Sequence, residues 1–251
     1  MSTLAHSGVG VLDKSLSLLA AVERGARSLS DIVTATGLSR ATAHRLATAL
    51  ETQGLLARDE PGRWKLGLRL FSLGSAAVRA FPIGEAARPA LMTLRTATGE
   101  SAQLYVREHD RRLCIAAVES TSGLRTIVHE GASLPLTAGS AGKVWIAWAP
   151  DGESERLISS VERLTPATPT DPNALRVELA GIRERGWAES VGEREVGVAS
   201  VSAPVLGARG EPVAVVSVSG PVERTGTSPG GRYAPEVVAA ARAVEAALGS
   251  A

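Results

Sequence analysis

Apolar residues recur at helical spacing over the first 54 residues, and glycines mark where the predicted helices end. Over residues 11–24 this spacing predicts a first helix. We expect its buried face to carry Leu12, Leu16, Leu19 and Ala20. Over residues 30–36 the pattern predicts a short second helix, which Gly37 ends in the left-handed conformation that glycine adopts at little cost. Together with the helix that follows, these segments indicate a three-helix core.

The helix predicted between Ser39 and Gly54 separates an apolar face from a polar one. Ser39 is a favoured N-cap residue. The apolar stripe, with members at i, i+3, i+4 and i+7, consists of Ala43, Leu46, Ala47 and Leu50. The opposite face carries Ala41, His44, Arg45, Thr48 and Thr52, with Arg40 and Thr42 near its N-terminal end. This small, basic surface suits a helix that enters the major groove of DNA, because bulk would hold it away from the bases and carboxylates would repel phosphates.

Two short strands are predicted directly after this helix, over residues 55–58 and 63–66. The four residues between them, Asp-Glu-Pro-Gly, are typical of a turn. A helix-turn-helix followed by such a hairpin is winged, and Arg58, Arg63 and Lys65 on the wing would lie near the flanking phosphates. The alternative for the helices alone is an ordinary helical hairpin joined through glycine. The two strands favour the DNA-binding interpretation.

A further helix is predicted over residues 68–80, and it carries more apolar surface than an isolated exposed helix should. Pairing with its copy in a dimer would bury that surface. Docking on its own chain is the alternative, and the sequence does not decide between the two. Phe81-Pro82-Ile83-Gly84 breaks the helical pattern and marks a domain boundary.

The remaining residues mix strands with helices. Helices are predicted over residues 85–98, 139–149, 172–186 and 233–248, the third of them capped by Asp171. Strands are predicted over residues 101–108, 113–118, 126–129, 187–191, 196–206 and 212–218. In the first of these strands, Ala102, Leu104 and Val106 alternate with polar neighbours, as in a half-buried strand. Hairpin links between strands indicate an α+β domain built on an antiparallel sheet.

Composition narrows the class of protein. The chain has 251 residues, 44% hydrophobic and 21% charged, which suits one or two globular domains. Cys114 is the single cysteine, so no disulfide can form within the chain and a reducing compartment fits. Because the sequence lacks a signal peptide pattern and any apolar run of roughly 18 residues, we expect a cytoplasmic protein without a membrane span.

Charge is distributed unevenly along the chain. The formal net charge is +1. Residues 1–80 hold 10 Lys and Arg against 6 Asp and Glu, a net charge of +4, whereas the rest of the chain holds 17 against 20, a net charge of −3. The basic excess therefore lies in the segment predicted to meet DNA.

The motifs in combination resemble the IclR family of bacterial transcriptional regulators, over nearly the whole chain. They are VLDKSLSLLAAVE, TAHRL in the helix-turn-helix, GRWKLGLRL in the wing, LPLTAGSAGKVWIAW, RGWAESVGEREVGVASVSAPV and VAVVSVSGP. The segments GESAQLY, SGLR and GEREVGVASVSAPV are most similar to those of the actinobacterial NdgR/LtbR-like subgroup. That likeness implies control of amino-acid metabolism, notably of leucine-biosynthesis genes.

The resemblance also implies a domain organisation. Residues 1–66 would form a winged helix-turn-helix domain, residues 67–83 a linker helix, and residues 84–251 a GAF-like domain for effector binding and oligomerisation. A homodimer or homotetramer would bind double-stranded DNA at an inverted-repeat operator, with half-sites about one helical turn, ~34 Å, or a multiple apart. We expect repression, although the residues themselves do not distinguish a repressor from an activator.

The family's effector pocket maps onto three places in this chain. Gly139, Ser140 and Ala141 match the loop before the pocket helix, and Ser217 and Ser219 match two alternating serines of the last strand. Ser200 stands where the family usually carries a cysteine, and Ser190 stands where an acidic residue is common. We also assign Leu124, in the SGLR segment, to this pocket. The two replacements mean that the keto acids taken by other members cannot be assumed here.

The residue chemistry fits a small polar ligand such as an amino acid or a keto acid. Ser217 and Ser219 are two apart on a strand, so both hydroxyls point to one face. Gly139 and Gly142 would let backbone N–H groups approach a carboxylate at the start of a helix. The alternative is that the serines are solvated outer-face residues. We expect the opposite, core-facing side to be supplied by Val201, Val215, Val216 and Val218.

Enzyme interpretations find little support. The segment GSAGK lacks the spacer of a phosphate-binding P-loop, and it is not a G-x-S-x-G nucleophile elbow. The four histidines are scattered, so neither a metal site nor a cofactor is predicted. Cys114 is expected to be an inert core thiol. The alternatives to a DNA-binding regulator are a metabolite-sensing protein whose winged module makes protein contacts, and an enzyme with a fused helix-turn-helix.

Overall fold

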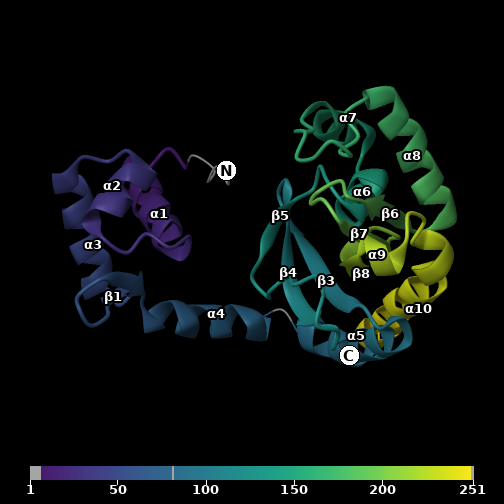
Figure 1. Cartoon of the computed structure of the whole chain (residues 1–251), viewed down its shortest axis with the longest axis horizontal. Coiled ribbons are helices and arrows are strands. Elements are labelled where there is room, and N and C mark those ends of the chain that lie inside the picture. The colour runs from purple at the N-terminus through teal and green to yellow at the C-terminus, as the bar shows by residue number, and fades with distance from the viewer. Residues whose placement is uncertain (1–6, 81, 250–251) are drawn as a thin grey trace. The chain divides into compact units, whose positions relative to one another are not determined.

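The computed structural model describes residues 7–80 and 82–249. Tertiary contacts divide the chain into two units, residues 1–81 and 82–251, which are described in turn (Figure 1). No helix within the described ranges has the length and apolarity needed to cross a membrane. The α+β fold class expected from the sequence is confirmed.

The N-terminal unit is a winged helix-turn-helix followed by one long helix. Its elements are α1 (Gly10–Glu23), α2 (Leu29–Thr36), α3 (Arg40–Thr52), β1 (Leu56–Arg58), β2 (Trp64–Leu66) and α4 (Leu68–Ala80). β1 and β2 pair antiparallel, with Leu56 opposite Leu66. The predicted apolar stripe of α3 is confirmed, because all four of its residues are buried in the core of this unit.

Local signals set the ends of these helices. Gly37 ends α2 with φ 68°, as expected. Ser39 caps α3 by accepting a hydrogen bond from the Thr42 N–H. α2 begins one residue before the predicted start, and Ser28 and Asp31 form a capping box that was not predicted. The Ser28 Oγ accepts from the Asp31 N–H, and the Asp31 carboxylate accepts from the Ser28 N–H at 2.8 Å.

The buried face of α1 differs in part from the one predicted. Leu18, Ala21 and Val22 are buried. Of the predicted residues, Leu19 and Ala20 are half-buried, and Leu12 and Leu16 are exposed. The helix carries two apolar faces, each with helical spacing, and spacing alone does not say which face packs on α2 and α3. Tertiary packing selected the one at the C-terminal end of the helix.

The C-terminal unit is built on a six-stranded antiparallel sheet of order β5-β4-β3-β8-β7-β6. Its strands are β3 (Ser101–Glu108), β4 (Arg111–Val118), β5 (Ser133–Pro135), β6 (Ala188–Val191), β7 (Val198–Leu206) and β8 (Pro212–Pro221). Its helices are α5 (Ile83–Thr98), α6 (Ser140–Trp148), α7 (Asp151–Ser159), α8 (Pro172–Arg185), α9 (Val222–Thr225) and α10 (Gly230–Gly249). β3 and β8 lie at the centre, so each has a partner strand on both sides.

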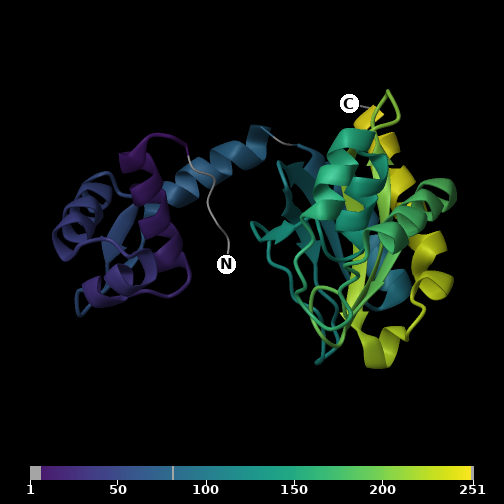
Figure 2. The same cartoon turned by 90° about the horizontal axis from the view of Figure 1, so that it is seen from above.

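Helices cover both faces of this sheet (Figure 2). α5 and α10 pack on one face, where Leu91, Leu104 and Val216 belong to one buried cluster. α6, α7 and α8 lie on the other, where Cys114, Val144 and Ile182 belong to a second cluster. Burial raises the pKa of the Cys114 thiol to about 12, in keeping with the inert thiol expected.

The secondary-structure predictions for this unit were wrong at two points and incomplete at a third. Residues 126–129 do not form a strand, and the edge strand is β5, Ser133–Pro135. α7 and α9 were not anticipated. β3 is not half-buried, because Ser101, Gln103 and Tyr105 are buried as well as their apolar neighbours. Alternating polar and apolar residues normally indicate that one face of a strand is solvated. Here helices cover both faces of the sheet, so the polar side chains of this central strand are buried as well.

Candidate functional site

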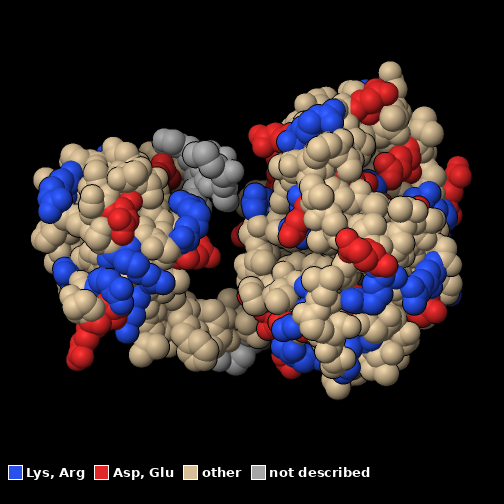
Figure 3. All heavy atoms as spheres, in the orientation of Figure 1, with Lys and Arg blue, Asp and Glu red and all other residues tan. Residues whose placement is uncertain are grey.

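The outer face of α3 is accessible, and it carries the residues predicted to read DNA. Arg40, Ala41, His44, Arg45 and Thr48 are exposed, and Thr42 is half-buried beside the Ser39 cap. Among the described residues neither Arg40 nor Arg45 forms an ion pair. Figure 3 shows Lys and Arg side chains gathered in patches on the visible face of the N-terminal unit. Both guanidinium groups are therefore available to a polyanion.

The wing cations differ from one another. Arg58 donates to the Glu51 carboxylate at 3.2 Å and stacks over the Trp64 ring, 3.9 Å from its centroid. Arg63 pairs with Asp59 at 3.2 Å. Lys65 is exposed and forms no ion pair within the described chain. Arg58 and Arg63 must exchange these internal partners to contact phosphates, which the sequence alone did not reveal.

A buried tryptophan fixes the wing to the helices. Trp64 is buried in the core of the N-terminal unit, and its backbone N–H donates to the Arg27 carbonyl at 2.8 Å. This bond joins β2 to the loop between α1 and α2. Because the Trp64 side chain shares a buried cluster with Leu46 and Leu50 of α3, the wing and α3 are held on one core.

In the C-terminal unit a small cavity of about 30 Å³ lies between the sheet and the start of α6. Its lining contains most of the predicted pocket residues: Gly139, Ser140, Ala141, Ser190, Ser200, Ser217 and Ser219. The cavity is also lined by residues that we did not predict: Tyr105, Arg112, Val128, Arg194, Glu195 and Val198. Its volume holds roughly two water molecules, so a larger ligand must displace some of this lining.

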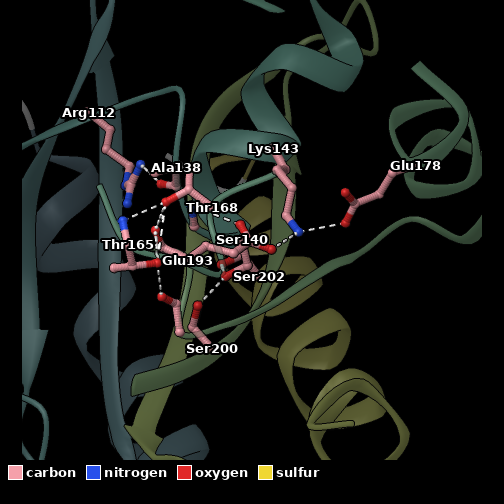
Figure 4. Close-up of polar contacts among 12 residues, drawn as sticks. Arg112, Ala138, Ser140, Lys143, Thr165, Thr168, Glu178, Glu193, Ser200 and Ser202 are labelled. Atoms are coloured by element: carbon pink, nitrogen blue, oxygen red, sulfur yellow. Dashed lines mark hydrogen bonds and ion pairs between the residues drawn. The ribbon is translucent and has the colours of Figure 1, made fainter. Parts of the chain in front are cut away.

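Serine hydroxyls connect the strands to α6 beside this cavity (Figure 4). The Ser140 Oγ lies 2.6 Å from the Ser200 Oγ and 2.7 Å from the Ser202 Oγ. The Ser202 hydroxyl donates to the Ser217 Oγ at 2.9 Å, and Ser219 donates to the Gln103 Oε1 at 3.2 Å. Because these serines are buried or half-buried, they are not the solvated outer-face residues of the alternative interpretation. Hydroxyls both donate and accept, so the cluster can re-pair around a polar guest.

The valines expected to oppose the serines divide between the two faces. Val201, Val216 and Val218 pack in the α5 and α10 core, as expected. Val215 belongs to the cluster on the α6 side, the same side as Ser217 and Ser219. Its position two residues before Ser217 requires this, because strand side chains alternate with a period of two. The assignment of Val215 to the opposite face was therefore wrong.

The start of α6 is more constrained than we predicted. Gly142 is closely packed, because a Cβ there would lie 2.0 Å from the Leu136 carbonyl oxygen, so a larger residue would not fit. Gly139 has φ 86° and ψ 160°, which glycine alone adopts readily. The Gly139 N–H already donates to the Glu193 carboxylate at 3.3 Å. An internal carboxylate thus occupies a position expected for the ligand.

Glu193 belongs to a buried ion network. The Lys143 Nζ lies 2.6 Å from a carboxylate oxygen of Glu193 and 2.6 Å from one of Glu178 on α8 (Figure 4). Burial raises the pKa of the Glu193 carboxyl, although Lys143 opposes that shift. The Glu193 carbonyl accepts from the hydroxyls of Thr165 and Thr168. These contacts tie the loop after β6 to α6 and α8.

Leu124 is the predicted pocket residue that the structure places elsewhere. Its side chain is 66% exposed, and it does not line the cavity. Its carbonyl accepts from Arg224 at 3.0 Å, and Arg224 also pairs with the buried carboxylate of Glu100. This arrangement gives no support to a contact between Leu124 and a ligand in the cavity.

Two family models match the chain. "IclR helix-turn-helix domain" matches residues 11–60, and "Bacterial transcriptional regulator IclR C-terminal" matches residues 75–246. The second match covers more than half of the chain, including every strand of the six-stranded sheet.

Individual proteins are similar along almost the whole chain. "Uncharacterized HTH-type transcriptional regulator RhmR" of Escherichia coli (strain K12) is 34% identical over 220 residues, which cover 86% of this chain and 85% of that protein. "Glycerol operon regulatory protein" of Streptomyces coelicolor is 32% identical over 246 residues, covering 95% and 96%. A crystal structure of an IclR homologue complexed with 4-hydroxybenzoate, from Microbacterium hydrocarbonoxydans, has a TM-score of 0.83 at 27% identity, covering 96% of this chain and 100% of that one.

Proposed function

Because this chain belongs to the IclR family of bacterial transcriptional regulators, we propose that α3 and the wing bind an operator and that the C-terminal cavity binds the effector. The chain is a DNA-binding transcriptional regulator with a C-terminal effector-binding domain, and it is not an enzyme. The observation that carries the proposal is the exposed face of α3, whose Arg40 and Arg45 form no ion pairs among the described residues.

The DNA contacts divide by chemistry. We assign Arg45 to a phosphate, and Arg40 and His44 to base edges, because the two latter residues lie nearer the N-terminal end of α3. The remaining contacts come from the cap and outer face of α3, namely Ser39, Ala41, Thr42 and Thr48, and from the wing, namely Arg58, Arg63 and Lys65. Lys65 is the wing residue that needs no change of partner.

An inverted-repeat operator requires two copies of α3, one for each half-site. α4 supplies a surface through which two copies of the chain can pair. Leu68, Phe71 and Val78 share one stripe of this helix, and Leu68 and Phe71 are 87% and 77% exposed. They do not pack on the rest of the described N-terminal unit. We propose that the regulator is a homodimer, or a tetramer of such dimers, in which this stripe is buried. Phe71→Glu should then lower the mass measured by light scattering, whereas Ala77→Glu on the opposite side of α4 should not.

The effector is a small polar metabolite, and the buried serine cluster supports an amino acid or a keto acid. The likeness of its C-terminal motifs to the NdgR/LtbR-like subgroup supports target genes in leucine and branched-chain amino-acid biosynthesis, with repression as the mode. The complex of a homologue with 4-hydroxybenzoate gives a precedent for a small carboxylate as the ligand. Thermal shifts with amino acids and keto acids test this assignment, since any ligand of the native state raises Tm.

A salt titration tests the DNA-binding proposal. Fluorescence anisotropy with a duplex from the region upstream of the gene should give a slope of log K against log salt of about −0.9 for each phosphate neutralised. Arg45→Ala should make the slope shallower on specific and random duplexes alike. Arg183→Ala is the matched control, because Arg183 is exposed on α8 and forms no ion pair among the described residues. Absence of binding at low salt would contradict the proposal.

A further inference from the structure

The cavity is lined by a buried cation that has no carboxylate partner in the part of the chain that the structure describes. Arg112 on β4 is 3% exposed and lines the cavity. Its Nη1 donates to the carbonyl oxygens of Pro135 and Ala138, the latter at 3.0 Å, and its guanidinium lies 5.5 Å from the centroid of the Tyr105 ring. Among the described residues its Nε has no hydrogen-bond partner, and it forms no ion pair. Such a group is costly to bury unless an anion completes its surroundings.

The carboxylates near Arg112 are already committed elsewhere. Glu193 is bonded to Lys143 at 2.6 Å and to the Gly139 N–H. Glu195 pairs with Arg194 at 3.2 Å. Burial lowers the pKa of Arg112 to about 10, so the group remains charged at neutral pH. The lining therefore carries one positive charge that its own residues leave uncompensated.

Part of the start of α6 is already engaged, because its Gly139 N–H faces Glu193. Arg112 adds a charged donor whose Nε–H is unused among the described residues, next to hydroxyls that can bond a neighbouring oxygen. A planar guanidinium also matches a carboxylate in geometry.

We propose that Arg112 anchors a carboxylate of the effector, so that this regulator responds to a small carboxylic acid and not to a neutral polyol or sugar. The assignment rests on the proposed use of the cavity as the effector site. Ser217 and Ser219 then bond the oxygen or nitrogen substituent beside the carboxylate. Arg194 and Glu195, on the loop after β6, move to admit a guest larger than two waters.

Matched pairs of acids and amides test this inference in the full-length protein. The probes are acetate and acetamide, pyruvate and pyruvamide, and 4-methyl-2-oxopentanoate and its amide, each at constant ionic strength and up to roughly 20 mM. Thermal shift and titration calorimetry should detect binding of at least one acid and no comparable binding of its amide. If no acid binds, or if acid and amide bind equally well, the proposal is overturned.

Variants of Arg112 identify the anchor. Arg112→Met should weaken binding of the acid by roughly tenfold to a hundredfold, the effect of losing a charged hydrogen bond. Arg112→Lys retains the positive charge but loses the two parallel N–H donors of the guanidinium, so it should weaken acid binding less. This variant keeps the test valid if Arg112→Met fails to fold. Arg111→Met is the control, because Arg111 is the preceding arginine of β4 and bonds Ser133 outside the cavity. Unchanged acid binding in folded Arg112→Met and Arg112→Lys would overturn the assignment.

A serine variant separates this inference from the proposed effector site. If Ser217→Val abolishes binding while both Arg112 variants retain it, the cavity is the effector site and the anchor is wrong. If Ser217→Val and Arg112→Met both leave binding unchanged, the effector site itself lies elsewhere. DNA binding is measured independently, so its failure would leave the result for Arg112 intact.

Discussion

The two units of this regulator handle positive charge in opposite ways. On α3, Arg40 and Arg45 are exposed and form no ion pair among the described residues. In the C-terminal unit, Lys143 is buried between two carboxylates, and Arg112 is buried beside a cavity. Exposed cations attract a polyanion over a distance and are screened by salt. Buried cations are screened much less by salt, and only a partner that fits the surrounding packing can reach them, so they select for size and geometry.

Removing the buried lysine should cause the largest effect. Lys143→Met leaves Glu193 buried without its cation, and breaking a buried pair in this way costs about 3–5 kcal/mol of unfolding free energy. Denaturant unfolding of the variant measures the loss. The control is Arg156→Met, which removes an exposed pair with Asp110 and should cost far less, because solvent screens such a pair. Equal losses of unfolding free energy in the two variants would contradict the distinction between buried and exposed cations.

Crowding at the start of α6 should give the next largest effect. A Cβ on Gly142 would lie 2.0 Å from the Leu136 carbonyl oxygen, so Gly142→Ala should cost about 1–3 kcal/mol of unfolding free energy or more. Gly152→Ala on α7 meets open space and serves as the control. If both substitutions leave the thermal midpoint unchanged, the packing that holds Gly139 and Ser140 beside the cavity is looser than described.

Operator binding by the N-terminal unit and carboxylate binding by the C-terminal unit should differ in their dependence on salt. Operator binding should weaken steeply as salt rises, whereas binding of a carboxylate at Arg112 should change little, because burial reduces screening.

Arg40→Ala and His44→Ala should each reduce the preference for the operator base pair that the side chain contacts by about 1–3 kcal/mol, and Arg45→Ala should not. Competition with mutated duplexes measures this preference, and equal losses on specific and random DNA for all three variants would contradict the division of roles.

The smallest expected effect concerns the capping box of α2. Hydrogen bonds from the N–H groups of Ser28 and Arg27 lower the pKa of Asp31 below its ordinary value of 3.8. A lowered pKa in the folded state means that the carboxylate stabilises the fold above that ordinary value, and that the gain is lost as pH falls through the folded pKa. The thermal midpoint of Asp31→Asn should lie slightly below that of the parent near pH 6, and the difference should vanish at lower pH. A constant difference would contradict this origin.

Local chemistry explains how much of the N-terminal unit was predictable. The Gly37 turn, the Ser39 cap and the apolar stripe of α3 are short-range signals, and each appears where it was predicted. The capping box of α2, which was not predicted, is also encoded locally, since Ser28 and Asp31 have capping-box spacing. The face of α1 was not encoded in this way, because two apolar faces competed and packing on other helices selected one.

The cavity shows what sequence patterns could not decide. Polar residues at alternate positions of β3 indicated a solvated face, yet helices cover both sides of that strand. Arg112 and Tyr105 become neighbours only through the pairing of β3 with β4, which shifts register between Leu104 and Tyr105. No spacing along one strand reports the register of another. The resemblance located the serines correctly around the cavity but contained no signal for the arginine.

The amino-acid sequence by itself determined the helix-turn-helix, the wing, the α+β class and the family, because each depends on short-range periodicity, capping or whole motifs. Tertiary structure alone decided which charges are compensated. Lys143, Glu178 and Glu193 meet from separate elements, whereas Arg112 has no carboxylate partner within the described part of the chain. A buried charge is compensated only when the fold brings an opposite charge close to it. The charged residues concerned lie far apart along the chain, so only the arrangement of sheet and helices sets the distances between them.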